Sequence, residues 1–352
     1  MRIQPVGFLT LLFFLLASPA VWSSQAEDPL QGALELHDAG KVKEAIPLYD
    51  KAIKANPKLA EAYFNRANAY YDLGQNQQAI KDYTEVIKLT PKDAEAYYSR
   101  ANAYRRLKQG QAALNDYTAA IKLNGADPRS YINRGSLHFD ARRYESAAQD
   151  FSAAVDLSPK DAELYYNRAN SYLALDKKEE AIKDYSQALA LDDRLVDAYY
   201  NRGIAYADSN QHKNAVEDFT EVLSLNPKSA EAFYNRALAK FKLAAYEAAI
   251  DDYSEAIRLN PKDAEAPYNR GLAYLKLAKQ DYAARDFSEV IRLQPKNADA
   301  LVYRGIVRLY QNKDKEADAD FHKAFQLNPG LKKKLQPLID EAKAKIRNQP
   351  KE

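Results

Sequence analysis

The chain has 352 residues, with 51 basic and 49 acidic side chains and no cysteine. This balanced charge gives no electrostatic basis for binding nucleic acid or an anionic membrane. The lack of cysteine excludes disulfides, thiolate metal sites and a lipid attached to cysteine. The length is typical of two domains unless the chain is built from repeats.

Residues 1–26 have the pattern of a secretory signal peptide. Arg2 precedes an apolar run over residues 6–17, and small residues follow up to Ala20 or Ala26, the two candidate cleavage sites. That run is shorter than the roughly 20 residues that cross a bilayer as a helix. We therefore expect cleavage and a periplasmic or secreted protein. The alternative is an uncleaved N-terminal anchor, the one way in which we expect membrane contact.

From residue 26 onward the sequence repeats every 34 residues. An arginine recurs at this interval without any insertion, at Arg66, Arg100, Arg134, Arg168, Arg202, Arg236, Arg270 and Arg304. A proline recurs in the turns at Pro57, Pro91, Pro159, Pro227, Pro261, Pro295 and Pro329, with Gly125 and Asp193 in the two missing places. Numbering this proline as position 32 gives nine repeats: 26–59, 60–93, 94–127, 128–161, 162–195, 196–229, 230–263, 264–297 and 298–331.

Each repeat contains two predicted amphipathic helices. In residues 60–93, one helical face carries positions 4, 8 and 11, which are Tyr63, Ala67 and Tyr70. The other helix carries positions 20, 24 and 27, which are Ala79, Tyr83 and Val86. Aspartates at the ends of several repeats are expected to cap the following helix, at Asp93, Asp161 and Asp263.

This pattern resembles the tetratricopeptide repeat, a helix-turn-helix of 34 residues with small residues at positions 8 and 20 and aromatic residues at 4, 11 and 24. The resemblance implies an all-α fold, a right-handed superhelical α-solenoid of nine repeats over residues 27–331. Local departures are Pro29 and Leu36 in the first repeat, Lys240 in the seventh and Pro267 in the eighth.

Residues 332–352 are predicted to form a capping helix with a basic tail. Apolar residues recur there at helical spacing, at Leu335, Leu338, Ile339, Ala342 and Ile346. A helix over residues 335–347 would cover the apolar face that the last repeat leaves exposed.

The recurring arginine at position 7 lies on the buried face, so it needs an anionic partner. Position 23 supplies an aspartate in each of the same eight repeats: Asp82, Asp116, Asp150, Asp184, Asp218, Asp252, Asp286 and Asp320. The first repeat lacks both residues, with Gly32 and Leu48 in their places. Pairing within each repeat leaves no residue of either kind alone, so we predict intra-repeat ion pairs such as Arg168 with Asp184. A ligand-binding role for these arginines is the less favoured alternative.

A different face of the first helices carries an asparagine at position 6 and an aromatic residue at position 5. The asparagines are Asn65, Asn133, Asn167, Asn201, Asn235 and Asn269. The aromatic residues include Tyr98, Tyr166, Tyr200, Tyr234 and Tyr268. In tetratricopeptide arrays this face lines a concave groove. Here it is similar to the peptide-holding surface of the array in O-linked N-acetylglucosamine transferase.

Two roles are open for these ladders. Carboxamides can hydrogen-bond an extended peptide backbone whatever its sequence, beside apolar tyrosine rings. Alternatively, each asparagine bridges neighbouring repeats and each tyrosine packs between them. Position 9 changes from Asn68, Asn102, Ser136 and Asn170 to Ile204, Leu238, Leu272 and Ile306, which predicts a groove that is polar first and apolar later. Acidic residues at position 2 either favour basic ligands or serve the helix N-termini.

No motif for catalysis, phosphate binding or metal binding is present, and the four histidines are far apart in sequence. We therefore expect a protein that is not an enzyme and takes no cofactor, metal, nucleic acid or small-molecule substrate. The predicted function is an exported scaffold that binds peptides or partner proteins in its groove. The alternative is an assembly subunit of an envelope secretion or polysaccharide-export complex. A lysine-rich clamp for chaperone termini is disfavoured, because position 5 is aromatic and position 2 acidic.

Overall fold

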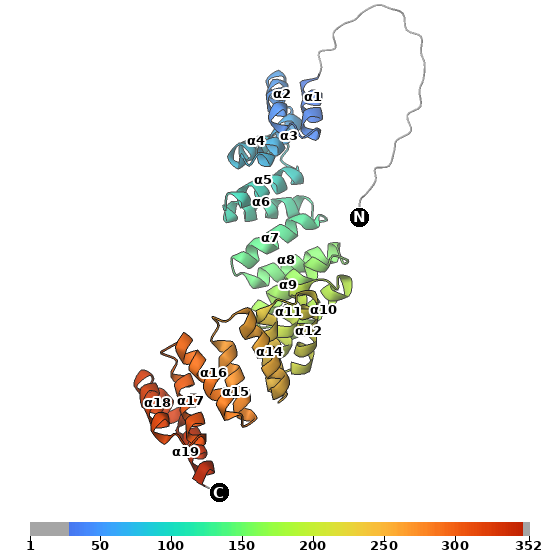
Figure 1. Cartoon of the computed structure of the whole chain (residues 1–352). Helices are drawn as coiled ribbons and strands as arrows, with labels where there is room; N and C mark the ends of the chain where they lie inside the picture. Colours follow the sequence, from blue (N-terminus) through green and yellow to red (C-terminus); the bar gives the residue numbers. More distant parts are fainter. Residues whose placement is uncertain (1–27, 348–352) are drawn as a thin grey trace, which may run out of the picture. The chain divides into compact units, whose positions relative to one another are not determined.

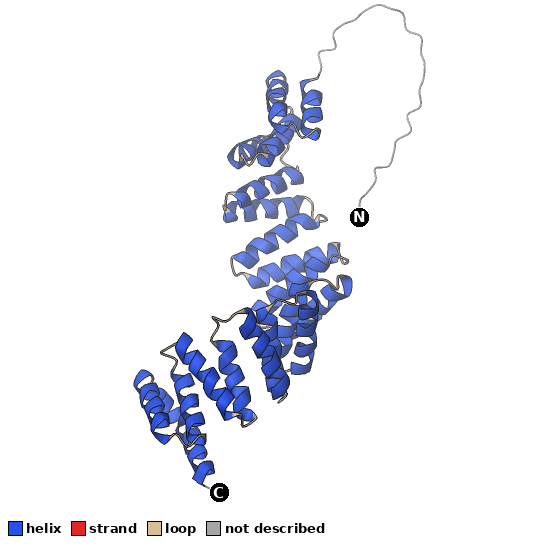
Figure 2. Cartoon of the chain, in the orientation of Figure 1, coloured by secondary structure: helices blue, strands red, loops and turns tan. Residues whose placement is uncertain are grey.

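The computed structural model describes residues 28–347, and in this range helices are joined by short turns without any strand (Figure 2). The all-α prediction is confirmed. The predicted signal peptide lies outside the described residues. No helix of residues 28–347 is long and apolar enough to cross a lipid bilayer.

The helices pair in chain order (Figure 1). They are α1 (Pro29–Asp38), α2 (Val42–Ala55), α3 (Ala60–Asp72), α4 (Asn76–Leu89), α5 (Ala94–Arg106), α6 (Gly110–Leu123), α7 (Pro128–Asp140), α8 (Tyr144–Leu157), α9 (Ala162–Ala174), α10 (Lys178–Leu191), α11 (Val196–Asp208), α12 (His212–Leu225), α13 (Ala230–Lys242), α14 (Tyr246–Leu259), α15 (Glu265–Lys276), α16 (Gln280–Leu293), α17 (Ala298–Tyr310), α18 (Asp314–Leu327) and α19 (Gly330–Arg347).

The helices form two compact units, one up to Asp116 and one from Tyr117 onward. Helices α3, α5, α7, α9, α11, α13 and α17 begin at the first residue of a predicted repeat. Helix α15 begins one residue late, with Pro267 in its first turn, where a proline removes no helical hydrogen bond. The predicted caps are confirmed, because backbone N–H groups donate to the carboxylates of Asp93, Asp161 and Asp263.

Each core is built on a small residue at position 8 that faces an aromatic ring at position 24. Glycine occurs at position 8 only where position 24 is phenylalanine, as Gly135 with Phe151, Gly203 with Phe219, Gly271 with Phe287 and Gly305 with Phe321. A Cβ atom on Gly203 would lie 2.9 Å from the Phe219 ring, so an alanine would push that ring away. The repeats with tyrosine at position 24 have alanine at position 8. The phenylalanine rings therefore sit closer to the first helix than alanine would allow.

The turn inside each repeat has one residue in the left-handed backbone region, at position 15. Glycine occupies this place only in the first two repeats, as Gly40 and Gly74. The later repeats have non-glycine residues there with positive φ, at Lys108, Arg142, Asp176, Asn210, Ala244, Ala278 and Asn312. Each such residue carries backbone strain that the packing of the two helices must offset.

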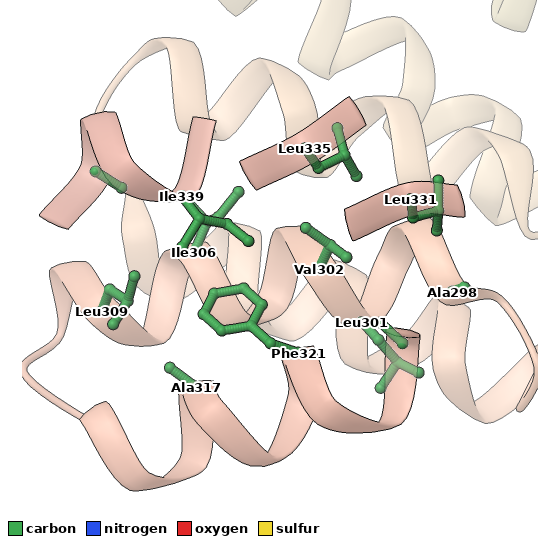
Figure 3. Packing of buried hydrophobic residues seen from close by; sticks show 12 residues of the cluster. Ala298, Leu301, Val302, Ile306, Leu309, Ala317, Phe321, Leu331, Leu335 and Ile339 are labelled. Atoms are coloured by element: carbon green, nitrogen blue, oxygen red, sulfur yellow. The ribbon is translucent and has the colours of Figure 1, made fainter. Parts of the chain in front are cut away.

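Helix α19 closes the last repeat by packing mainly on α17. Figure 3 shows Leu331, Leu335 and Ile339 on one side of the cluster, facing residues of α17 such as Val302. The predicted start of the capping helix at 335 was wrong by five residues. The buried side chain of Leu331 extends the apolar stripe by one turn, so the helix begins at Gly330.

Candidate functional site

Each arginine at position 7 forms a bidentate ion pair with the aspartate at position 23 of its own repeat. In the fifth repeat, Arg168 Nε donates to Asp184 Oδ2 at 2.6 Å, and its Nη2 donates to Oδ1 at 2.8 Å. The same pairing joins Arg66 to Asp82, Arg100 to Asp116, Arg134 to Asp150, Arg202 to Asp218, Arg236 to Asp252, Arg270 to Asp286 and Arg304 to Asp320. The hydrogen bond to Asp184 raises the pKa of Arg168. The predicted intra-repeat pairing is confirmed.

The same arginines also connect neighbouring repeats, in a contact that we did not predict. Nη1 of Arg168 donates to Ser152 Oγ, at position 25 of the preceding repeat, at 3.3 Å. For all eight arginines the acceptor is the residue at position 25 of the preceding repeat: Asp50, Thr84, Thr118, Ser152, Ser186, Thr220, Ser254 and Ser288. The last repeat, which no arginine follows, has His322 there. This column of small oxygen-bearing residues is a sequence signal that could have revealed the contact.

A second cation joins some of these pairs from position 11. Lys240 Nζ lies 2.7 Å from Asp252 Oδ2, and Arg308 Nη1 lies 2.6 Å from Asp320 Oδ2. Lys240 therefore gains an ion pair in place of the expected aromatic packing. Because all these groups contact one another, the position 7 arginines have a structural role.

Three position 6 asparagines bridge neighbouring repeats, as one of the two predicted roles requires. The Nδ2 atoms of these residues donate to tyrosines at position 5 of the preceding repeat: Asn201 to Tyr166 at 3.4 Å, Asn235 to Tyr200 at 2.9 Å and Asn269 to Tyr234 at 3.0 Å. Asn65 donates to the Glu61 carbonyl of its own helix. Asn133 and Tyr98 occupy the same positions of α7 and α5.

Asn167 differs from these residues, because the repeat before it has Ile132 at position 5. An isoleucine offers no hydroxyl, and the carboxamide of Asn167 forms no hydrogen bond with any side chain or backbone group of residues 28–347. Its donors and acceptor are therefore open to a ligand.

The position 5 tyrosines belong partly to the core. Four of them, Tyr166, Tyr200, Tyr234 and Tyr268, pack on the aromatic ring at position 24 of their own repeat, with ring centroids 5.8 to 6.0 Å apart. Burial raises the pKa of Tyr234 to about 12. These half-buried rings contribute both to packing and to the face that carries the asparagines.

A second polar pair links position 24 to position 9. Tyr83 Oη donates to Asn68 Oδ1, and Tyr185 Oη donates to Asn170 Oδ1, both at 2.6 Å. The seventh repeat has Leu238 at position 9, and there the buried Tyr253 hydroxyl has no partner among the described residues. The predicted change of position 9 from polar to apolar is therefore also a change in hydrogen bonding inside the repeats.

The face that carries positions 5, 6, 9, 12 and 13 is hollowed in the second compact unit. One pocket, of about 160 Å³, is lined by Ser136, Phe139, Asp140, Phe151, Asn167 and Asn170. A second, of about 240 Å³, lies beside Tyr200, Tyr234 and Asn235. A third, of about 510 Å³, is lined by apolar residues of the later repeats such as Leu272 and Ile306, and also by the charged residues Lys276 and Glu341. We name this surface the asparagine face.

Within residues 28–347, histidine, cysteine, aspartate and glutamate nowhere gather in threes that could hold a metal ion. The Nε2 atom of His138 lies 3.9 Å from Asp150 Oδ2, and burial lowers the pKa of His138. This histidine replaces the usual tyrosine of position 11, beside the ion pair of the fourth repeat.

Comparison with protein families gives matches along most of the chain. A model described as TPR repeat matches residues 33–74, 67–108, 170–210 and 245–277. Models described as tetratricopeptide repeat match residues 98–162, 151–183, 196–229 and 268–330. The chain belongs to the tetratricopeptide repeat family.

Among solved structures, one with a TM-score above 0.5 shows the same architecture. A tetratricopeptide repeat protein from Cytophaga hutchinsonii is 17% identical over 78% of this chain and 98% of its own, with a TM-score of 0.53, and supports the fold alone. YrrB, described as a TPR protein with an unusual peptide-binding site, is 28% identical over 52% of this chain and 94% of its own, with a TM-score of 0.48. MamA from Desulfovibrio magneticus is 25% identical over 48% of this chain and 96% of its own, with a TM-score of 0.46. Comparison with curated proteins gave no match.

Proposed function

We propose that this tetratricopeptide repeat protein is an exported scaffold that binds peptides or partner proteins on the asparagine face. The observation that carries the proposal is the row of pockets on that face, where carboxamides lie beside aromatic rings, phenylalanines in one pocket and tyrosines in another. Repeat arrays present long surfaces of this kind, and they bind partners through them without catalysis.

The chemistry of the face suits an extended chain. A carboxamide has two N–H donors and a carbonyl oxygen with two lone pairs. The single bond from Asn235 to Tyr200 therefore leaves one donor and the oxygen for a ligand, while Asn167 keeps its whole capacity. Peptide backbone groups have the same donors and acceptors in every sequence, so such a face can hold a backbone with little dependence on side chains.

Photo-crosslinking in cells can test this function. A photoreactive phenylalanine analogue at Phe139 lies on the face, whereas the same analogue at Leu225, which is 44% exposed at the end of α12, lies outside it. We expect covalent protein or peptide adducts from position 139 and few from 225. Adducts confined to position 225 would reject the groove and favour an envelope assembly subunit.

Export is part of the same proposal and rests on the apolar segment of residues 6–17 with its small-residue flank. The mature protein should be recovered outside the inner membrane, with an N-terminus that follows Ala20 or Ala26. Recovery of an intact N-terminus in the membrane fraction would support the uncleaved anchor instead.

A further inference from the structure

The pocket between the fourth and fifth repeats is the most distinctive part of the asparagine face. Its volume of about 160 Å³ is below the roughly 300 to 1,000 Å³ that is usual for small-molecule sites. A pocket of this size suits one side chain of a bound peptide. Its shape depends on residues of the fourth repeat that differ from those of the adjacent repeats.

The fourth repeat creates this space by substitution. Position 9 has Ser136 where the second, third and fifth repeats have asparagine, and position 24 has Phe151 where those repeats have tyrosine with its hydroxyl. Ser136 Oγ donates to the Ile132 carbonyl of its own helix, at 2.9 Å. The shorter, inward-bonded serine leaves unfilled the volume that an asparagine would occupy.

The pocket keeps several polar groups without partners. Asp140, an exposed residue at the end of α7, forms no ion pair with any group of residues 28–347. Asn167 has an open carboxamide, as described above. Asn170 accepts from Tyr185 at 2.6 Å and from Asn201 at 3.1 Å through Oδ1, so its orientation is fixed and its own N–H groups stay open.

We propose that this pocket takes the cationic side chain, lysine or arginine, of a peptide bound on the asparagine face, an inference that rests on the proposed function. The aliphatic stem lies against Phe139 and the edge of Phe151, and the cation meets the Asp140 carboxylate and the Asn167 carbonyl oxygen. The Asn170 amide group donates to the peptide backbone.

The charge of the lining selects this occupant over others. Asp140 is the one ionised group that lines the pocket, so an anionic side chain would be repelled. A purely apolar side chain would desolvate the carboxylate and two carboxamides without giving them partners, which is unfavourable. A lysine or arginine side chain can pack its aliphatic part against the phenylalanine rings while its charged group is bonded to the oxygen acceptors.

The sixth repeat provides a matched control. Asp208 occupies the same position 13 as Asp140 and is also exposed. At that junction, however, the next asparagine, Asn235, is bonded to Tyr200. Asp208→Asn therefore changes the same charge at the same place in a repeat, without altering the pocket.

The test uses the purified full chain and three alanine-serine nonapeptides with blocked termini, which differ only in a central lysine, norleucine or glutamate. Isothermal titration at low salt measures Kd for the parent, Asp140→Asn and Asp208→Asn. We expect the lysine peptide to bind about tenfold more tightly than the norleucine peptide, as for a charge-assisted hydrogen bond. Asp140→Asn should remove that difference, and Asp208→Asn should preserve it.

The inference would be overturned if the two aspartate variants had equal effects on Kd, or if the lysine and norleucine peptides bound equally well. Either result would still be compatible with the binding of peptide backbones on the asparagine face. Failure of the parent to bind any of the three peptides would count against the proposed function itself. Circular dichroism of both variants should match the parent, since each aspartate is exposed.

Discussion

The fifth and seventh repeats have the same fold and the same buried ion pair, yet they differ in which polar side chains are hydrogen-bonded. The fifth bonds its position 24 tyrosine and the seventh bonds its position 6 asparagine. In the fifth, Asn170 accepts from Tyr185, while the side-chain carboxamide of Asn167 has no partner among residues 28–347. In the seventh, Asn235 is bonded to the preceding repeat, while the Tyr253 hydroxyl has none among the described residues. Ile132 removes the partner of Asn167, and Leu238 removes the partner of Tyr253. A single residue, in the same repeat or in the one before it, therefore decides whether a polar side chain can bind a ligand.

The largest expected effect comes from the shared ion pair. Arg168→Ala leaves Asp184 buried without a cation, which should cost on the order of 3 to 5 kcal/mol. Arg236→Ala should cost less, because Lys240 still lies 2.7 Å from Asp252. Urea unfolding followed by circular dichroism measures both changes.

The control for that comparison is the double variant Arg168→Met with Asp184→Leu, which should be nearly neutral because no charge is left unpaired. An unchanged melting midpoint for Arg168→Ala would contradict the structural role of the pair.

The two buried tyrosines should respond with opposite signs. Tyr253→Phe removes a hydroxyl without a partner and should stabilise the chain by up to about 1 to 3 kcal/mol. Tyr185→Phe loses the bond to Asn170 and should destabilise it by about 0.5 to 1.5 kcal/mol. Thermal melts of the two variants measure the difference, and shifts of the same sign would refute the assigned hydrogen bonding.

Ile132→Tyr should give Asn167 of the fifth repeat the same hydrogen bond to the preceding repeat that Asn235 has in the seventh. The new hydroxyl can accept from Asn167, as Tyr200 does from Asn235, and should add about 0.5 to 1.5 kcal/mol of stability. Because Asn167 is then engaged, binding of the lysine nonapeptide should weaken. Unaltered stability together with unaltered peptide binding would show that Ile132 does not decide the state of Asn167.

The smallest effect is a pH dependence confined to the fourth repeat. Burial lowers the pKa of His138 from its ordinary 6.5, so the unfolded chain binds a proton at higher pH than the folded chain. Stability from this residue should be complete above about pH 6.5 and decline as the pH falls through the folded pKa. Unfolding free energies at about pH 8 and about pH 5.5 should differ less in His138→Tyr than in the parent. An equal difference would assign the pH dependence to other groups.

Much of the fold was predictable because a strict period of 34 residues reports each local environment many times. The loss of arginine and aspartate together in the first repeat gave the pairing. The start of α19 was less predictable, because Leu331 follows a proline turn and only its burial against α17 shows that it belongs to the helix.

By itself the sequence determined the repeat, the helix register and the ion pairs, because helical spacing fixes which residues of one hairpin face each other. Only the tertiary structure decided that the arginines bond to position 25 and that three asparagines bond to the tyrosines of the preceding repeat. The recurring residues at positions 25 and 5 are visible in the sequence, but whether they meet depends on how closely one hairpin stacks on the next, and side-chain packing sets that distance.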